Sequence, residues 1–191
     1  MLLTGRIEEN LKQVRKMQMV DPFSSTQNRH YTFHLAFSGR YDEAIEESFR
    51  QQERFPEFSM HGFRAMIYWA QGLREKAIDE ERLELEHQED ETLLTSLEEG
   101  LSAGGPVGAL RAIGEVWAAR AESQFVDPFH IAVTFARAEM LDEAIYWFER
   151  AIERGSPRVA YLTVWPGLDV LRDDPRYKRL LQRAGLSEFA Q

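Results

Sequence analysis

Apolar residues recur at intervals of three and four along most of the chain, the spacing that places them on one face of a helix. Two segments show it most clearly, with Tyr41, Ala44, Ile45 and Phe49 in one and Leu141, Ala144, Ile145, Phe148, Ala151 and Ile152 in the other. No segment alternates apolar and polar residues as a half-buried strand would. The ranges 41–55, 73–99 and 109–126 contain no proline, and their one glycine is Gly114. These ranges are therefore predicted helices. The sequence predicts an all-α protein.

Turn positions recur at a nearly constant spacing. The series consists of Gly5, Gly39, Gly72, Gly105 and Glu139. Pro22 and Pro56 are separated by the same step as Gly5 and Gly39, and Asp-Glu-Ala-Ile follows two of the turns. Copies at a fixed spacing indicate a repeat protein whose units stack on their neighbours. The register of the copy at 91–123 stays open by one residue, because either Gly104 or Gly105 can form its turn.

This pattern resembles the tetratricopeptide repeat (TPR), a family whose period of about 34 residues matches the step between these turns. Ala44, Ala77 and Ala144 stand five residues after their turns, where that family keeps a small alanine, and Phe148 fills the aromatic position that follows. The family's leading tryptophan is missing, and Asn28 stands there in the first full copy. The resemblance implies a right-handed solenoid of antiparallel helix pairs that binds a protein or peptide in its concave groove.

Under this resemblance, residues 1–191 form a single TPR-like domain. Its expected parts are a half repeat at 1–22, helix pairs at about 25–56, 58–89, 91–123 and 126–156, and a C-terminal cap at 157–191. Within the cap, Asp174 is a predicted N-cap, Pro175 fits the first helical position, and Gly185 is a typical helix stop. The last third of the chain also resembles the C-terminal TPR segment of bacterial signalling and transcription regulators.

Composition narrows the possible partners. The formal net charge of −9 repels phosphate backbones, which argues against nucleic acid. The chain has no cysteine, and this excludes disulfides and thiolate metal sites. No apolar run approaches the ~20 residues of a membrane span, and the N-terminus lacks the apolar stretch of a signal peptide. We therefore expect a cytoplasmic protein.

Candidate catalytic and metal-ligating residues form no convincing set. His30 and His34 are four residues apart, but they lack the glutamate of a zinc-protease motif and a third ligand. Paired glutamates such as Glu46 and Glu47 lie among basic residues, which is typical of solvated helix faces. The glycine-rich stretch at 102–108 lacks the lysine of a phosphate loop. The sequence predicts no enzyme, no metal and no cofactor.

The first helix of each pair is expected to line the groove. The predicted groove residues are Arg29, Phe33, Phe37, Met66, Trp69, Phe129, Val133 and Arg137. A peptide would bury apolar side chains on the aromatic residues, and an acidic group would pair with Arg29 or Arg137. Alternatively, some of these aromatic residues belong to the core, as helix-spaced aromatic residues usually do. Phe33 occupies the place of an asparagine that chaperone-tail binding requires, so that ligand is not expected.

The first helix of the half repeat is missing, which leaves an apolar stripe to be covered. The stripe consists of Ile7, Leu11, Val14 and Met17. Either the chain is part of a longer protein, or two copies pair through this edge as a homodimer. The leading functional prediction is a non-catalytic interaction module, and the alternative is a sensory or regulatory segment of a bacterial signalling or transcription regulator.

Overall fold

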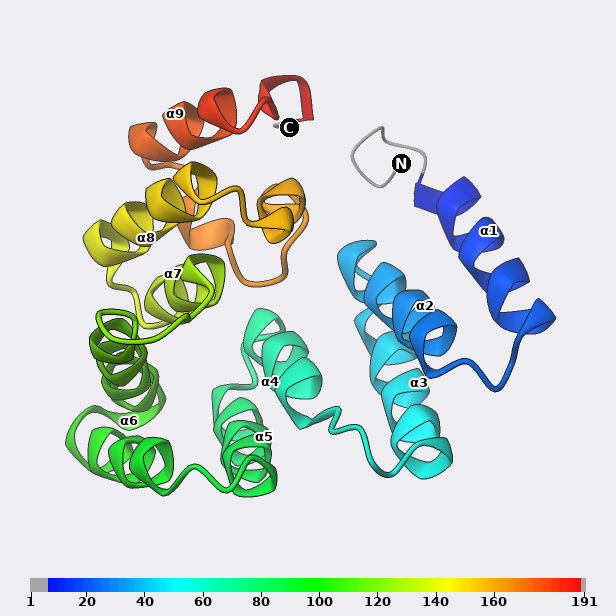
Figure 1. Cartoon of the computed structure of the whole chain (residues 1–191), viewed down its shortest axis with the longest axis horizontal. Coiled ribbons are helices and arrows are strands. Elements are labelled where there is room, and N and C mark those ends of the chain that lie inside the picture. Colours follow the sequence, from blue (N-terminus) through cyan, green and yellow to red (C-terminus); the bar gives the residue numbers. More distant parts are fainter. Residues whose placement is uncertain (1–6, 190–191) are drawn as a thin grey trace. The chain divides into compact units, whose positions relative to one another are not determined.

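The computed structural model describes residues 7–189, and the side chains of residues 8–188 (Figure 1). Within that range the protein is all-α, as predicted, with no strand. The α-helices are α1 (Ile7–Val20), α2 (Ser25–Phe37), α3 (Tyr41–Arg54), α4 (His61–Ala70), α5 (Arg74–His87), α6 (Glu91–Arg120), α7 (Pro128–Arg137), α8 (Leu141–Glu153) and α9 (Pro175–Arg183). Short 3-10 helices η2 (Pro157–Tyr161), η3 (Asp169–Leu171) and η4 (Ser187–Phe189) accompany α9.

The helices belong to two compact units, one ending at His87 and the other beginning at Gln88. This boundary falls inside the range 73–99, which the sequence predicts to be one helix. That prediction is wrong, because α5 ends at His87 and Glu89 adopts a positive φ of 56°. Asp90 then caps α6 by accepting a hydrogen bond from the backbone N–H of Leu93. Neither residue at the break is glycine or proline, so composition did not show it, whereas the expected helix pairs at 58–89 and 91–123 meet at this point.

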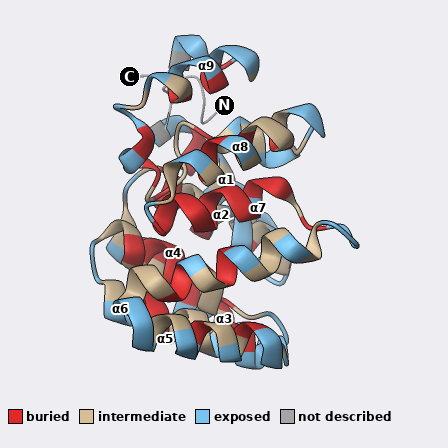
Figure 2. Ribbon diagram, turned by 90° about the vertical axis from the view of Figure 1, so that its left-hand side faces the viewer, coloured by how far each residue is buried: buried red, intermediate tan, exposed pale blue. Residues whose placement is uncertain are grey.

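Unit 1 contains α1 to α5, each packed against the next along the chain in the pairs α1–α2, α2–α3, α3–α4 and α4–α5. Alanines lie where helices approach most closely, and Ala44, Ala65 and Ala77 are fully buried. A small side chain at such a crossing lets two helix backbones come together. Figure 2 shows buried residues concentrated on α4, which carries much of the core of this unit.

Unit 2 begins with α6, which is two helical segments joined by a sharp turn. Gly104 and Gly105 have non-helical backbone angles, and Gly105 has a φ of 62°. The two segments touch at Gly100 and Gly108, where a Cβ on Gly100 would lie 2.5 Å from the Gly108 carbonyl oxygen. Pro106 follows the turn, where its missing N–H costs no helical hydrogen bond. The predicted turn is therefore present, and it includes both of the candidate glycines.

The rest of unit 2 packs around α7, which contacts α6 and α8 and is buried on almost every side (Figure 2). The predicted C-terminal helix is present as α9, with Asp174 as N-cap and Pro175 in its first turn. Its Tyr177 hydroxyl donates to the Leu162 carbonyl (3.0 Å), and burial raises the pKa of Tyr177 to about 12. This contact ties α9 to the loop that follows η2.

The turns after α2, α4 and α7 share one backbone geometry. Gly39, Gly72 and Glu139 have φ angles of 76°, 76° and 61°. In each turn the backbone N–H of the residue after the positive-φ position donates to the carbonyl five residues before it. These bonds run from Arg40 to Leu35 (3.0 Å), from Leu73 to Tyr68 (2.8 Å) and from Met140 to Phe135 (3.0 Å). This arrangement ends a helix and reverses the chain. Among the described helices, none is long and apolar enough to cross a membrane.

Candidate functional site

The predicted groove residues of unit 1 are mostly buried. Phe37, Met66 and Trp69 lie in the core of the unit. Phe33 is half-buried, because its ring packs against Phe37 (5.7 Å between centroids) and edge-on against Phe63 of α4 (4.8 Å). These aromatic side chains therefore hold α2 and α4 together, and their burial corrects the prediction that they line an open groove.

The same correction applies to the groove residues of unit 2. Phe129 is 0% exposed and packs edge-on against Phe148 (5.4 Å) and Trp165 (5.1 Å). Val133 and Arg137 are also buried on α7. Part of this cover comes from the C-terminal segment, since Trp165 packs on Phe129 and η3 packs against α7. Sequence periodicity placed all three residues on one helix but did not show that this helix is covered.

Arg29 is the one predicted groove residue that is exposed, and it lines a pocket in unit 1. The pocket has a volume of about 90 Å³ and is lined by Ser25, Thr26, Arg29, Gln51, Phe55, Phe58 and Met60. It therefore combines one guanidinium, two hydroxyls, one amide and three apolar walls. Sequence reasoning identified Arg29 but missed the other six residues, which come from α2, α3 and the loop between α3 and α4.

Local hydrogen bonds fix the walls of this pocket. Ser24 caps α2 by accepting from the Gln27 N–H (3.3 Å), which places Ser25 and Thr26 in the first helical turn. At the other wall, the Phe55 N–H donates to the Gln51 carbonyl (2.8 Å) and the Phe58 N–H to the Phe55 carbonyl (3.0 Å). These bonds shape the loop so that Phe55 is half-buried while Phe58 remains 44% exposed.

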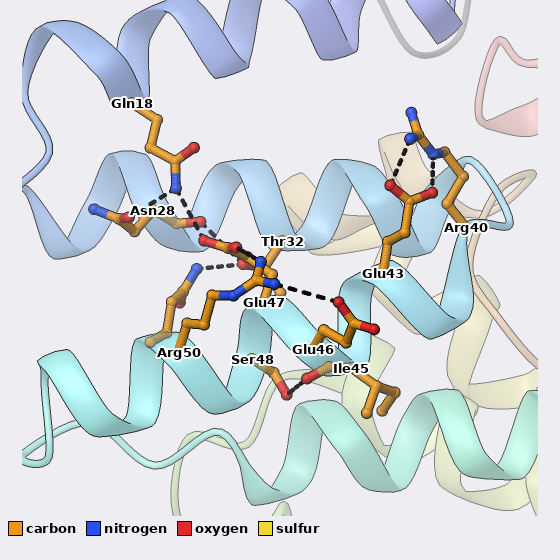
Figure 3. A network of polar contacts seen from close by, with 11 residues as sticks. Gln18, Asn28, Thr32, Arg40, Glu43, Ile45, Glu46, Glu47, Ser48 and Arg50 are labelled. Carbon is orange, nitrogen blue, oxygen red and sulfur yellow. Dashed lines mark hydrogen bonds and ion pairs between the residues drawn. The ribbon is translucent and has the colours of Figure 1, made fainter.

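A network of polar side chains lies between α1, α2 and α3 (Figure 3), and the pocket residue Gln51 belongs to it. Gln51 Nε2 donates to the Thr32 hydroxyl, which donates in turn to the Asn28 carbonyl (3.1 Å). Gln18 of α1 reaches both Asn28 Oδ1 (2.8 Å) and Glu47 Oε1 (2.9 Å). The network thus joins α1, α2 and α3 and links the pocket residue Gln51 to the helix at the chain's N-terminal side.

The predicted oligomer edge is only partly exposed. Leu11 is buried and Val14 is half-buried, so the prediction of an uncovered stripe is wrong for Leu11, which faces the unit's interior. Met17 is exposed, and the side chain of Ile7 lies outside the described residues. The most exposed apolar side chains of this region are instead Val20 and Phe23, at the end of α1 and in the loop after it.

A charged cluster joins α4 and α5. Arg64 is almost fully buried; its Nε donates to Glu80 Oε1 (2.9 Å), and its guanidinium lies over the Phe49 ring (4.5 Å). His61 Nδ1 lies 2.7 Å from Glu80 Oε2 and 2.8 Å from Arg64 Nη2. These contacts join the two helices of the hairpin, while Arg64 Nη1 is buried without a hydrogen-bond partner among the described residues, and we interpret the cluster as structural. The sequence showed only a glutamate pair and a histidine here.

Of the predicted glutamate pair, Glu46 is exposed, but Glu47 is buried and accepts from Gln18, so the prediction of a solvated helix face is wrong for Glu47. His34 Nδ1 hydrogen-bonds the His30 carbonyl (2.8 Å), and partial burial lowers the pKa of His34. In the part of the chain that the structure describes, no group of three or more acidic or histidine side chains is arranged to hold a metal ion.

Comparisons of the chain with models of protein families, with curated proteins and with solved structures found no match.

Proposed function

We propose that the protein is a non-catalytic interaction module, built of TPR-like helix pairs, that binds a peptide segment of a protein partner at the Arg29 pocket. The observation that carries this proposal is the size of the pocket. About 90 Å³ exceeds the ~10–15 Å³ that a single water needs. It is far below the ~300–1,000 Å³ of sites that enclose a whole small-molecule ligand. The pocket accommodates one side-chain head group of a larger partner.

The repeating turns support the TPR-like part of the proposal. Gly39, Gly72, Gly105 and Glu139 all have positive φ and follow one another at a nearly constant step along the sequence. Ala44, Ala77 and Ala144, each five residues after a turn, are all fully buried. A constant turn step with a small residue at the same place is expected when each helix pair packs in the same way.

Exposed aromatic side chains support the binding part. Phe58 forms one wall of the pocket and remains 44% exposed, and Phe23 is exposed in the loop that leads into α2. Rigid aromatic side chains supply contact area at low conformational cost and are frequent hot spots of protein interfaces. A partner that places one group in the pocket has apolar surface beside it on which to pack.

The experiment compares partner capture by three forms of the full chain. Purified wild type, Phe58→Ala and Phe125→Ala are each used as bait in extract from the source organism. Phe125 is the matched control, because it is 81% exposed but lies in unit 2 and does not line the pocket. We expect Phe58→Ala to lose a partner that both other forms retain, with unchanged circular dichroism. Equal recovery by all three forms would remove the pocket from the proposal.

A further inference from the structure

We infer that the Arg29 pocket takes an acidic side chain, glutamate or aspartate, of the partner peptide. This inference rests on the proposed function and specifies the chemistry of that same site. The charge, the hydrogen-bonding capacity and the apolar walls of the pocket all favour such a side chain.

The charge of the pocket is unusual for this protein. Arg29 makes no hydrogen bond or ion pair with any residue that the structure describes, and none of the lining residues is acidic. Yet the chain as a whole carries a formal charge of −9, and the nearby Arg54 already donates to the Pro22 carbonyl (3.0 Å). A guanidinium has five N–H donors and pairs well with a carboxylate. The exposed guanidinium of Arg29 is therefore the one charged group of the pocket lining and is accessible to an anionic group.

Gln51 adds a hydrogen-bond acceptor to the lining of the pocket. Its Nε2 is fixed as a donor to Thr32, whose own hydroxyl proton goes to the Asn28 carbonyl. Gln51 Oε1 is then the free end of the amide, and no described residue donates to it. An amide oxygen accepts hydrogen bonds and cannot donate them. A backbone N–H of a bound peptide would pair with it, and a lone inorganic anion would not.

The walls favour a carboxylate over a phosphate. Phosphate groups carry nearly two negative charges and are usually held by clusters of arginine. Here a single guanidinium is accompanied by Phe55, Phe58 and Met60, which suit the methylene groups of an acidic side chain and an apolar neighbour. A peptide with an acidic residue beside an apolar one matches all of these features.

The test uses defined pools of short peptides with acetylated N-termini and amidated C-termini. One central position is fixed as Glu, Gln, Lys or phosphoserine, the positions beside it are apolar, and the others are randomised. Binding to the full chain is measured by fluorescence anisotropy at low salt. We expect the Glu pool to bind best and Arg29→Gln to bind it about ten-fold more weakly, the loss expected for one charge-assisted hydrogen bond. Arg29→Glu should shift the preference to the Lys pool.

Arg15→Gln is the matched control, because Arg15 is an exposed arginine on α1 of the same unit that does not line the pocket. It should bind the Glu pool as the wild type does. The inference is overturned if Arg29→Gln binds normally, if the phosphoserine pool is preferred, if only peptides with a free C-terminal carboxylate bind, or if no pool is preferred. If no pool is preferred while Phe58→Ala still loses its captured partner, the proposed function stands and only the ligand class is wrong.

Discussion

The interior shared by α1, α2 and α3 differs in kind from the interior around α7, α8 and α9. Between the first three helices the buried polar residues are Asn10, Asn28, Thr32, Glu47, Ser48 and Gln51. Around α7 the buried residues are mainly large and apolar, namely Phe129, Ile131, Phe135, Phe148, Leu162, Leu168, Leu171 and Leu180. Both regions contain a fully buried alanine five residues after a turn, Ala44 in one and Ala144 in the other, yet their cores differ in kind.

Because their interiors differ, the two regions are expected to contribute differently to the free energy of unfolding and to the register of the helices. A buried hydrogen bond contributes a net ~0.5–1.5 kcal/mol, whereas a fully buried phenyl ring contributes about 1.5–3 kcal/mol. The apolar interior of unit 2 therefore supplies more stability per residue. The polar network of unit 1 instead favours one register, because shifting α2 against α3 would leave the buried Gln51 Nε2 without its acceptor on Thr32. The candidate pocket lies at the polar end, where side-chain positions are fixed by hydrogen bonds.

The largest expected effect comes from emptying the apolar interior. Phe129→Ala removes a fully buried ring that contacts Phe148 and Trp165, and we expect a loss of about 3–5 kcal/mol from the free energy of unfolding of unit 2. Urea titration followed by circular dichroism measures it. Phe58→Ala, which removes a half-exposed ring, is the control and should change stability little. A loss below about 1 kcal/mol in Phe129→Ala would mean that this ring is not part of a close-packed core.

Overpacking tests whether the two regions share their helix geometry. Ala44 and Ala144 are both fully buried and stand five residues after a turn. Ala44→Trp and Ala144→Trp should each cost about 1–3 kcal/mol or more, since a large side chain at a close contact forces the backbones apart. Thermal and urea unfolding report the cost. If both variants unfold like the wild type, the register assigned from the repeated turns is wrong in both regions.

Much of the helical framework was predictable, because it follows from local rules. The turns at Gly39 and Gly72 and the cap at Asp174 come from residue types whose backbone preferences act without tertiary contacts. The repeat step placed a break here, since it ends one expected helix pair at 89 and begins the next at 91. Local residue types did not show it, because glutamate rarely adopts a positive φ. Next to this break, Arg120 from the far end of α6 donates to Asp90, a contact between residues distant in sequence.

The candidate site was less predictable than the fold. Helical periodicity identified Arg29 and a row of aromatic residues, but it did not distinguish a ring facing solvent from one facing a neighbouring helix. Phe37 and Trp69 are buried because other helices cover them, which depends on contacts distant in sequence. The pocket also uses Phe55 and Phe58, which lie in a loop outside any periodic pattern. Only the assembled unit brings them beside Arg29.

A smaller effect is expected from removing one hydrogen bond of the polar interior. Thr32→Val removes the hydroxyl that Gln51 Nε2 meets, and we expect a loss of about 1–2 kcal/mol because a buried donor is left unpaired. Adding Gln51→Leu should recover part of this loss, since both polar partners are then gone. The coupling energy from a double-mutant cycle measures the interaction. Additive losses would show that these two side chains do not depend on each other.

The smallest expected effect tests an ion pair that closes the α6 hairpin of unit 2. Arg120 donates to both carboxylate oxygens of Asp90 (2.5 and 2.8 Å), and these bonds hold the pKa of Asp90 below its ordinary 3.8. A carboxylate with a lowered folded-state pKa stabilises the protein above pH ~4 and loses that contribution as the pH falls through the folded value. Asp90→Asn should therefore lower the free energy of unfolding by about 1 kcal/mol at neutral pH, and its difference from the wild type should shrink below pH ~4.

Thr32→Val serves as the comparison, because neither Thr32 nor Gln51 titrates. The loss of stability in Thr32→Val should therefore stay the same as the pH falls. Urea unfolding at a series of pH values measures both, and a difference for Asp90→Asn that persists at low pH would contradict a contribution from the charge of Asp90, since asparagine caps a helix as well as aspartate does.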